Sequence, residues 1–416
     1  MKSAVRNLGL IIMSIGFMYG CKVSQPVQPS PVTLSEGDTL KMVIVDSVQI
    51  KPDSIVLVVK DTIPKPQYPD TVNLKISKLE PDTVTIIGVG DIMMGTNFPS
   101  ANYLPPNEGR ELLKEVTPIL QNADVTFGNL EGVILDEGGI QKTCSNPDVC
   151  YLFRTPEKYV HHLLAAGFDV MSMANNHAGD FGNPGRENTM RVLREAGLHF
   201  SGLLSTPYTT FEQNGVKYGF VAFAPNTGTV SINDLPNAKK IVAHLDSISD
   251  IVIVSFHGGA EGKKYQHVTR ETEYFYGENR GNVYRFAHQL VDVGADVIFG
   301  HGPHVTRALE VYKNRFIIYS LGNFCTYARF NLSGENGIAP ILKVYTDKTG
   351  AFYKADIIPI YQPGEGGPKI DPQRRAIATL QRLTNSDFPE LKIIISDEGE
   401  VLAPDQEKLL GTTDKK

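Results

Sequence analysis

The chain has 416 residues, of which 41% are hydrophobic and 21% are charged. This composition is ordinary for a globular protein and excludes a chain that is disordered throughout. The 40 basic and 46 acidic side chains give a net charge of −6 with histidine neutral, so bulk positive charge cannot hold nucleic acid. The length allows two to three domains, or one large α/β unit with tails.

The first 21 residues predict a lipoprotein signal peptide. Lys2 and Arg6 precede an uncharged apolar stretch, Leu8–Tyr19, which is too short to span a bilayer. The stretch runs into a Gly-Cys pair ending at Cys21, which resembles a bacterial lipidation site, although the two residues before this pair differ from the usual ones. An ordinary signal peptide with a chance cysteine is the alternative. We expect an extracytoplasmic protein that a lipid on Cys21 anchors to a bacterial membrane, at the periplasmic face or the cell surface.

The segment after the signal peptide differs in composition from the rest of the chain. Residues 22–81 are rich in Pro, Ser, Thr, Val and Asp, which predicts an extended, disordered tether. Short alternating runs within it keep a small hairpin open as an alternative. Residues 82–385 are expected to form the organised domain, and residues 386–416 a C-terminal strand and a flexible polar tail.

Two neighbouring cysteines predict a loop disulfide. Cys144 and Cys150 flank the turn-forming sequence Asn-Pro-Asp, and an oxidising compartment favours a bond between them. A metal site at this pair is disfavoured because no nearby histidine or further cysteine completes four ligands. Cys325 is then the odd thiol.

From about residue 83 the sequence alternates short apolar runs with amphipathic stretches. The apolar runs predict strands at Thr83–Val89, Asp124–Gly128, Phe168–Met173, Tyr218–Phe223, Asp250–Phe256, Ala295–Gly300 and Arg315–Ser320. Apolar residues three and four apart predict helices at 111–121, 157–167, 187–197 and 283–294. The alternation predicts an α/β fold with largely parallel strands and helices on both faces.

Polar side chains follow five of these predicted strands. The strands run into GDIMMG, GNLEG, ANNHAGD, HGGAEG and GHGPH, in chain order. Because the carboxyl ends of parallel strands share one edge of an α/β sheet, these segments should converge in space. Their glycines allow sharp turns and leave room for a ligand.

The converging segments supply carboxylates, amides and imidazoles, which together suit borderline divalent ions such as Mn, Fe or Zn. Taken singly, each group has a structural alternative. Asp91 could cap a helix, Glu131 could pair with a surface arginine, and His257 could be a satisfied polar group. Taken together, the groups favour one or two divalent cations, because a carboxylate such as Glu131 can bridge two ions.

Five segments, taken in order, resemble one protein family. GVGDIMMG, FGNLEG, MANNHAGDFG, SFHGGAE and GHGPHVTRALEVYKNRFIIYSLGNF are similar to the CapA family, also called the PgsA or poly-γ-glutamate capsule biosynthesis family, over roughly residues 84–385. The resemblance implies the fold of the calcineurin-like metallophosphoesterases, with layered sheets flanked by helices. It also implies a role in the biosynthesis of a capsule or another polyanion.

The resemblance further implies roles for individual residues. It implies six metal ligands: Asp91, Glu131, Asn176, His257, His301 and His304. Asp91 and His304 would belong to a first metal, Glu131 would bridge, and the others would belong to a second metal. His177 would take the place of the general acid, and Asp180 would orient it.

Two departures from the superfamily pattern leave catalysis by the two-metal scheme open. Met93 stands two residues after Asp91, where the phosphoesterases have a histidine, so the first metal loses a ligand. The closing motif is His301-Gly-Pro-His304 in place of His-x-His, which moves the last imidazole by one residue.

Three arginines are candidate substrate-binding residues: Arg270, Arg280 and Arg329. The first two lie in an insertion at residues 262–282, which is rich in Arg, Tyr and Glu and could cover the site as a lid. A guanidinium group can clamp a carboxylate or a phosphate with two hydrogen bonds. A solvated surface position is the alternative for these arginines.

Three functions follow from these observations. The chain could be a lipid-anchored, metal-dependent hydrolase of the phosphoesterase type that acts on a phosphorylated cell-envelope substrate or polymer. It could instead bind an anionic polymer without hydrolysis and help a membrane synthase or export machine. A surface lipoprotein with a decayed site is the third possibility. The family resemblance favours capsule biosynthesis.

Overall fold

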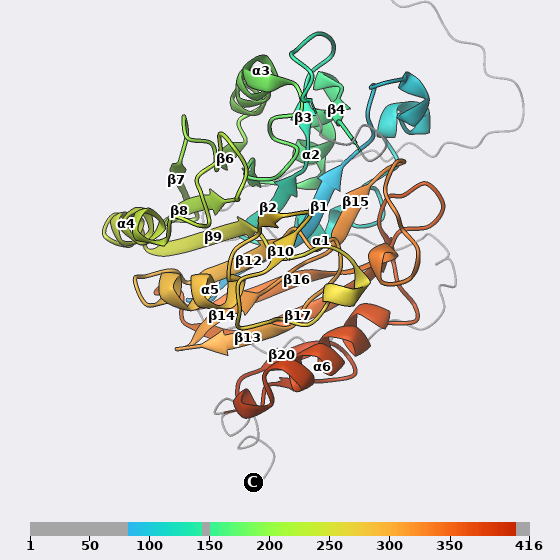
Figure 1. The fold of residues 1–416 in the computed structure, drawn as a ribbon. Coiled ribbons are helices and arrows are strands. Elements are labelled where there is room, and N and C mark those ends of the chain that lie inside the picture. The colour runs from blue at the N-terminus through green and yellow to red at the C-terminus, as the bar shows by residue number, and fades with distance from the viewer. Residues whose placement is uncertain (1–81, 144–149, 405–416) are drawn as a thin grey trace, which may run out of the picture. The chain divides into compact units, whose positions relative to one another are not determined.

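The computed structural model describes residues 82–143 and 150–404, which lie within the unit Lys75–Lys416 (Figure 1). The predicted signal peptide with Cys21, the tether at residues 22–81 and the tail beyond residue 404 lie outside these ranges, and so does Cys144. Within the described ranges, no helix has the length and apolar character that crossing a membrane requires.

All seven predicted strands are present, but they divide between two sheets. The first sheet has ten strands. In spatial order they are β19 (Ile394–Ile395), β20 (Glu400–Leu402), β17 (Phe352–Tyr361), β16 (Ile338–Thr346), β1 (Val84–Met93), β2 (Val125–Leu130), β5 (Val170–Ser172) and β6 (His199–Ser201), with β15 (Asn323–Thr326) beside β1 and β18 (Lys369–Ile370) beside β17. The run from β1 to β6 and the pair β1–β15 are parallel, whereas β16 and β17 are antiparallel to their neighbours.

The second sheet has six strands. Their spatial order is β13 (Leu309–Tyr312), β14 (Arg315–Ile318), β12 (Val297–His301), β9 (Ile251–His257), β8 (Val216–Phe223) and β7 (Tyr208–Gln213). The central strands are parallel, and the two edge strands are antiparallel. Two short pairs complete the strands: β3 (Val133–Ile134) with β4 (Arg154–Thr155), and β10 (Tyr274–Phe275) with β11 (Glu278–Asn279).

The predicted single edge of parallel strands is wrong. The strands form two sheets, and each sheet contains both parallel and antiparallel pairs. An apolar run shows that a strand is buried on both faces, but it carries no information about which sheet the strand joins. The broader prediction, an α/β fold of layered sheets flanked by helices, is confirmed.

The two sheets pack face to face across a shared core. Ile86 on β1 and Phe127 on β2 belong to the same apolar cluster as Phe299 on β12. The rings of Phe127 and Phe299 stack with their centroids 5.2 Å apart. Gly88 makes room for this contact, because a Cβ atom at residue 88 would lie 2.3 Å from the ring of Phe299.

The α-helices cover the outer faces of the two sheets, except for the last one, whose Ile377 and Leu380 belong to the core that the two sheets share (Figure 1). Those of the described ranges are α1 (Thr117–Leu120), α2 (Val160–Ala166), α3 (Gly182–Glu195), α4 (Leu235–Asp246), α5 (Val283–Val291) and α6 (Arg375–Asp387). The first three contribute to the apolar cluster on the outside of β1 and β2, and α4 and α5 to the cluster on the outside of β8 and β9. The sheet faces and the amphipathic helix faces thus bury one another.

The predicted helix at residues 111–121 is wrong in length. Only Thr117–Leu120 is α-helical. Proline lacks a backbone N–H and clashes with the carbonyl four residues earlier, so Pro118 is tolerated in the first turn of a helix but not in its interior. The helix accordingly starts one residue before Pro118.

Four aspartates fasten the amino-terminal ends of parallel strands. Each one precedes its strand and accepts a hydrogen bond from a backbone N–H of the neighbouring strand, at 2.7 to 2.8 Å: Asp124 from Thr85, Asp169 from Thr126, Asp250 from Lys217 and Asp296 from Val252. These aspartates accept hydrogen bonds from backbone N–H groups at the point where hydrogen bonding between the strands ends. Because they lie at the ends of the strands opposite the polar segments, we assign these aspartates a structural role.

Asp296 leads to a prediction on stability and pH. Burial raises the pKa of Asp296 to about 6, although a backbone N–H from Val252 and the charge of Arg315 oppose the rise. Because this folded-state pKa lies above the ordinary value of 3.8, the stabilising effect of the protonated carboxyl is lost as the pH rises through about 6. We expect the unfolding free energy of the wild type, relative to Asp296→Asn, to fall by about 2 kcal/mol between pH 4.5 and pH 7.

Urea unfolding of both proteins at the two pH values measures this difference. Asp250→Asn is the matched control, because Asp250 also accepts a backbone hydrogen bond before a parallel strand but is exposed. The control should keep the pH dependence of the wild type. The same pH dependence in the wild type and in Asp296→Asn would contradict the prediction.

Candidate metal centre

Asp91 lies near the carboxyl end of β1, where the strand is irregular. The register of β1 shifts against β2 between Gly88 and Asp91, and against β15 directly after Asp91. The backbone N–H of Asp91 donates to the carbonyl of Gly322 at 2.9 Å. Only glycine fits before Asp91, because a Cβ atom on Gly90 would lie 1.9 Å from that carbonyl oxygen. The irregular strand thus fixes the direction of the Asp91 side chain.

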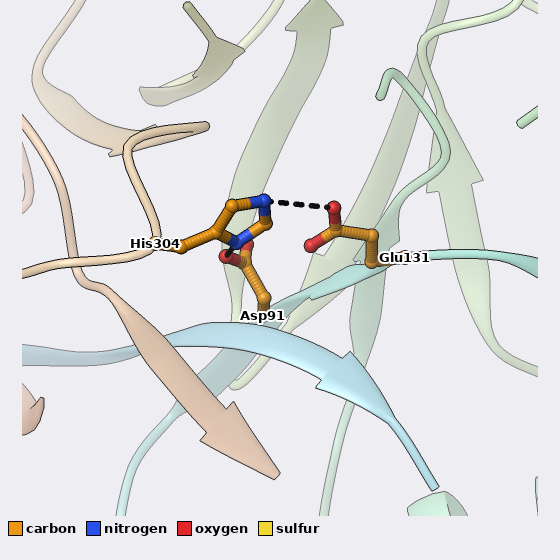
Figure 2. Close-up of side chains that lie close together, drawn as sticks. All are labelled: Asp91, Glu131 and His304. Carbon is orange, nitrogen blue, oxygen red and sulfur yellow. Dashed lines mark hydrogen bonds and ion pairs between the residues drawn. The ribbon is translucent and has the colours of Figure 1, made fainter. Parts of the chain in front are cut away.

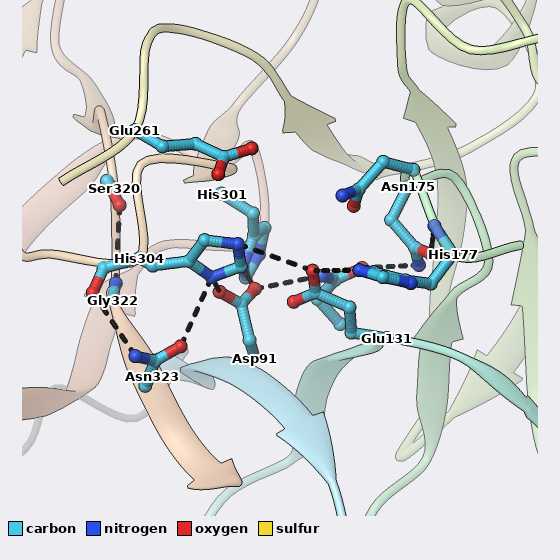
Figure 3. A network of polar contacts seen from close by, with 12 residues as sticks. Asp91, Glu131, Asn175, His177, Glu261, His301, His304, Ser320, Gly322 and Asn323 are labelled. Carbon is cyan, nitrogen blue, oxygen red and sulfur yellow. Dashed lines mark hydrogen bonds and ion pairs between the residues drawn. The ribbon is translucent and has the colours of Figure 1, made fainter. Parts of the chain in front are cut away.

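The carboxylate of Asp91 joins residues from both sheets. Its Oδ1 accepts a hydrogen bond from Asn129 Nδ2 at 2.8 Å and lies 3.2 Å from His301 Nδ1. Its Oδ2 lies 2.9 Å from His304 Nδ1 (Figure 3). Asn129 belongs to β2 and His301 ends β12, so the carboxyl ends of the two sheets meet at Asp91.

Glu131, directly after β2, completes a compact cluster. Asp91, Glu131 and His304 each offer one ligand atom, and these atoms lie within 4.8 Å of one another. Figure 2 shows the His304 ring between the two carboxylates, with its Nε2 atom 3.5 Å from Glu131 Oε1. His304 has a left-handed backbone, with φ +56°, which is uncommon for a residue with a side chain. The one-residue shift in the closing motif therefore does not remove this imidazole from the cluster.

The electrostatics of the cluster differ strongly between its members. Burial opposes the ionisation of Asp91, but hydrogen bonds with His301 and His304 hold the pKa of Asp91 well below its usual range. Burial, and then the charge of Asp91, raise the pKa of Glu131 well above its usual range. Burial disfavours the charged form of His304, but the charge of Glu131 and the hydrogen bond with Asp91 raise its pKa to about 10. Without a cation, protons on Glu131 and His304 offset the charge of Asp91, and a bound cation would take the place of these protons.

Several buried atoms around the cluster have no hydrogen-bond partner in the described part of the chain. They are both carboxylate oxygens of Glu131, Oδ1 of Asn176, both ring nitrogens of His257 and Nε2 of His301. Buried polar atoms are nearly always paired, and each of these residues offers at least one atom with a lone pair that can bind a metal. Burial, and then the charge of Arg280, lower the pKa of His257 well below its usual range, which keeps this ring in the neutral form that binds metals. These residues therefore fit one or two divalent cations.

The other departure from the phosphoesterase pattern concerns Met93, which stands where the phosphoesterases have a histidine. Met93 is buried at the end of β1, where its backbone pairs with Thr326 of β15. No imidazole occupies that position, and among the described His, Cys, Asp and Glu side chains the compact group consists of Asp91, Glu131 and His304.

His177 and Asp180 form a buried pair beside Glu131. Asp180 Oδ2 lies 2.7 Å from His177 Nδ1 and also accepts the backbone N–H of Phe153 at 2.8 Å. The other ring nitrogen, Nε2, lies 4.0 Å from Glu131 Oε1. The ring of Phe153 packs against His177 with a centroid distance of 4.4 Å. This arrangement fixes the imidazole with Nε2 on the side of Glu131, and the role of His177 as a proton donor stays a prediction.

Two of the candidate substrate-binding arginines are engaged by carboxylates. Arg280 is buried and pairs with Glu261 and Glu278, in both cases at 2.6 Å. Arg270 pairs with Glu390 and lies over the ring of Tyr284. Substrate binding by either arginine would need these ion pairs to open, so it stays a prediction.

The insertion at residues 262–282 is fastened at several places. Glu273 makes two 2.8 Å contacts with Arg307, whose side chain is fully buried. His267 lies 2.6 Å from Asp387 at the end of α6. Breaking a buried ion pair costs roughly 3–5 kcal/mol. These contacts hold the insertion to the rest of the domain, and its role as a lid over the site stays a prediction.

The two remaining cysteines of the described ranges differ in state. Cys150 is disulfide-bonded, whereas Cys325 is free and buried in β15. Because Cys144 lies outside the described residues, its pairing with Cys150 stays a prediction. Burial raises the pKa of the Cys325 thiol, so we assign no reactivity to it.

Sequence reasoning missed four polar residues that surround the site: Asn129, Asn175, Glu261 and Asn323. Asn129 lies two residues before Glu131, a spacing that places both on one face of a strand, so the GNLEG motif carried a signal for it. Asn323 Oδ1 lies 3.2 Å from His304 Nδ1, and Asn175 Nδ2 donates to the carbonyl of Leu130 at 2.8 Å. Figure 3 shows Glu261 above His304.

The fold and the site together define a layered α/β protein with a buried carboxylate–imidazole site that suits divalent cations. Residues 85–328 match the family described as bacterial capsule synthesis protein PGA_cap. This match covers more than half of the chain, so the chain belongs to that family. The resemblance to CapA that the sequence motifs indicate is thereby confirmed.

Curated relatives and a solved structure are similar to this chain to different degrees. The chain is 30% identical over 265 residues to the capsule biosynthesis protein CapA of Bacillus anthracis, covering 59% of this chain and 60% of the relative. It is 27% identical over 267 residues to the PGA biosynthesis protein CapA of Bacillus subtilis, covering 60% and 65%. Both matches span less than two thirds of the relative's length. A candidate 5′-nucleotidase of Staphylococcus aureus is similar with a TM-score of 0.40 and 15% identity, over 72% of this chain and 58% of that one. A TM-score this low supports no conclusion about activity.

Proposed function

We propose that this chain binds one or two divalent cations and works in the biosynthesis or export of an anionic capsule polymer of the poly-γ-glutamate type. One observation carries the proposal: a family of capsule synthesis proteins matches the region in which Asp91, Glu131 and His304 form a buried cluster. The relatives named CapA support the polymer class. The donor atoms support a borderline ion such as Mn, Fe or Zn.

Different residues would bind each of the two ions. Asp91 and His304 would hold one, and the unpaired atoms of Asn176, His257 and His301 a second, with Glu131 between them. When bound, such ions supply positive charge that polarises a phosphoryl or carbonyl oxygen. The surrounding backbone would keep the donors in place, as the contact of Asp91 with Gly322 does.

A second function, an active metal-dependent phosphoesterase, is favoured by the pair of His177 and Asp180. A buried imidazole whose Nδ1 is held by a carboxylate can give a proton from Nε2 to a leaving oxygen. A chain that only binds polymer has no need for such a pair. A non-catalytic polyanion-binding lipoprotein is the remaining alternative, in which the pair would have lost its role.

The proposal also includes a cellular location for the protein. We place the protein outside the cytoplasm, held by a lipid on Cys21, where it would meet the membrane synthase or exporter that handles the polymer. The apolar stretch Leu8–Tyr19 and the cysteine after it support this localisation.

The test uses the full chain in detergent micelles, loaded with Mn²⁺, Fe²⁺ or Zn²⁺ in turn. Bound metal is counted by elemental analysis, binding of fluorescein-labelled poly-γ-glutamate is measured by anisotropy, and turnover is measured with phosphomonoester and phosphodiester reporters. We expect bound metal and polymer binding that weakens as salt rises, since the partner is anionic. Labelled neutral dextran is the control and should not bind.

The outcomes separate the candidate functions. Polymer binding without turnover supports the accessory role, and turnover of a reporter supports the phosphoesterase. Absence of both bound metal and polymer binding would overturn the proposal and favour a decayed site.

A further inference from the structure

The proposed polymer and the chain carry charge of the same sign. The chain has a net charge of −6, so attraction must come from local positive groups and not from the whole surface. Near the metal centre, Arg280 is paired with two glutamates and Arg307 with Glu273. These guanidinium groups are already neutralised by their partners. Recognition of the polymer therefore needs a cation near the site that lacks a carboxylate partner.

Arg329 is such a cation. No carboxylate of the described residues forms an ion pair with it, and its buried Nε has no hydrogen-bond partner. The guanidinium carbon instead lies 4.9 Å from the ring centre of Tyr103 and 5.0 Å from that of Tyr151. Contacts with two aromatic rings restrict the guanidinium group without neutralising its charge.

The turn that carries Arg329 is held in an unusual conformation. Ala328 and Arg329 have left-handed backbones, with φ +52° and +55°. The backbone N–H of Tyr327 donates to the carbonyl of Met93 at 2.9 Å, and that of Ala328 donates to the carbonyl of Glu365. Consecutive left-handed residues with side chains cost energy and cluster at functional sites. The turn is therefore fastened to β1, the strand that carries Asp91.

Aromatic contacts connect this turn to the site itself. Phe330, directly after Arg329, packs edge-on against the ring of His304 at a centroid distance of 5.9 Å and stacks on Phe153 at 5.0 Å. Phe153 in turn packs on His177. Tyr151 is 45% exposed, so the stacked guanidinium group lies at an open rim, not in the core. The residue after Arg329 thus contacts the cluster, while Arg329 itself contacts a partly exposed ring.

We propose that Arg329 binds an oxyanion of the ligand whose neighbouring group enters the metal cluster. The oxyanion is either a carboxylate along an acidic polymer or a phosphate, because both accept two parallel hydrogen bonds from a guanidinium group. A preordered side chain loses little entropy when it binds, which favours recognition by a single arginine. This inference rests on the proposed function and assigns a recognition residue to the same site.

The test compares Arg329→Gln with the wild type, using the full chain and two probes. The probes are fluorescein-labelled poly-γ-glutamate, followed by anisotropy, and inorganic phosphate, followed by calorimetry. We expect affinity for at least one probe to fall by about tenfold or more, because a charge-assisted hydrogen-bond pair is lost. Arg194→Gln is the matched control, since Arg194 is exposed and also lies over an aromatic ring, that of Phe200, but on α3. It should bind like the wild type.

Each outcome decides a separate point. A loss confined to the polymer identifies a carboxylate as the bound group, and a loss with phosphate identifies a phosphate. Wild-type affinity of Arg329→Gln for both probes overturns the inference and leaves the proposed function standing. Failure of the wild type to bind either probe overturns the inference, and it overturns the proposed function as well when bound metal is also absent. Tyr103→Leu removes one stacking ring without changing the turn, and it should weaken binding in the same direction even if Arg329→Gln does not fold.

Discussion

Glu131→Gln is expected to lower the affinity of the full chain for Mn²⁺ by about 100-fold or more, the largest effect on binding that we predict. Loss of residues that merely orient a ligand typically costs 10- to 100-fold in metal affinity, and Glu131 is expected to bind the ions directly. An amide is neutral and cannot bridge two cations as a carboxylate does. Among the described residues, neither buried oxygen of Glu131 accepts a hydrogen bond, and Oε1 contacts His304 Nε2 at 3.5 Å, so both oxygens are available to a cation.

The same substitution should not destabilise the metal-free chain. Burial and the charge of Asp91 raise the pKa of Glu131, which means that an ionised carboxylate is unfavourable there without a cation. We therefore expect Glu131→Gln to unfold, without metal, at the wild-type temperature or above it, and to lose the rise in melting temperature that Mn²⁺ gives the wild type.

Calorimetric titration and thermal unfolding with and without Mn²⁺ measure these two effects. Glu137→Gln is the matched control, because Glu137 is an exposed glutamate six residues away in the same segment. It should match the wild type in both measurements. Unchanged Mn²⁺ affinity in Glu131→Gln would show that the cluster is not a metal site.

The sequence predicts the position of the site better than the arrangement of the sheets. Asp91, His301 and His304 are more than two hundred residues apart at the extremes, yet they touch, because each follows or ends a strand whose apolar run is easy to recognise. Periodicity alone could not assign these strands to two sheets. Both sheets are buried on both faces, so their strands have the same apolar pattern.

Contacts that depend on packing between distant segments could not be predicted from the sequence. Glu261 faces the site only because Arg280 and the fastened insertion hold its segment there. The stacking of Arg329 between Tyr103 and Tyr151 joins three loops that are far apart in the chain. The sequence LGNF before Arg329 indicates where this turn lies in the chain, but it does not indicate that Tyr103 and Tyr151 contact the guanidinium group. By contrast, the shortened α1 could have been predicted from Pro118, since proline restricts where a helix can begin.

The pair of His177 and Asp180 allows the sharpest test of the second candidate function. Under that function, His177→Asn should lower turnover of a phosphomonoester by roughly 10²- to 10⁴-fold, because asparagine cannot donate a proton from the position of Nε2. Bound metal should not change. The loss should be larger for an alkyl phosphate than for p-nitrophenyl phosphate, since a good leaving group needs less protonation.

Asp180→Asn and a surface histidine complete this test. Asp180 holds His177 through Nδ1 at 2.7 Å and would act only by positioning the ring, so its replacement should lower turnover less and shift the pH profile. His161→Asn, at an exposed position on α2, is the matched control and should keep full activity. If His177→Asn lowered turnover equally for both leaving groups, proton donation would be excluded, and the imidazole would act on the cluster through its contact with Glu131 instead.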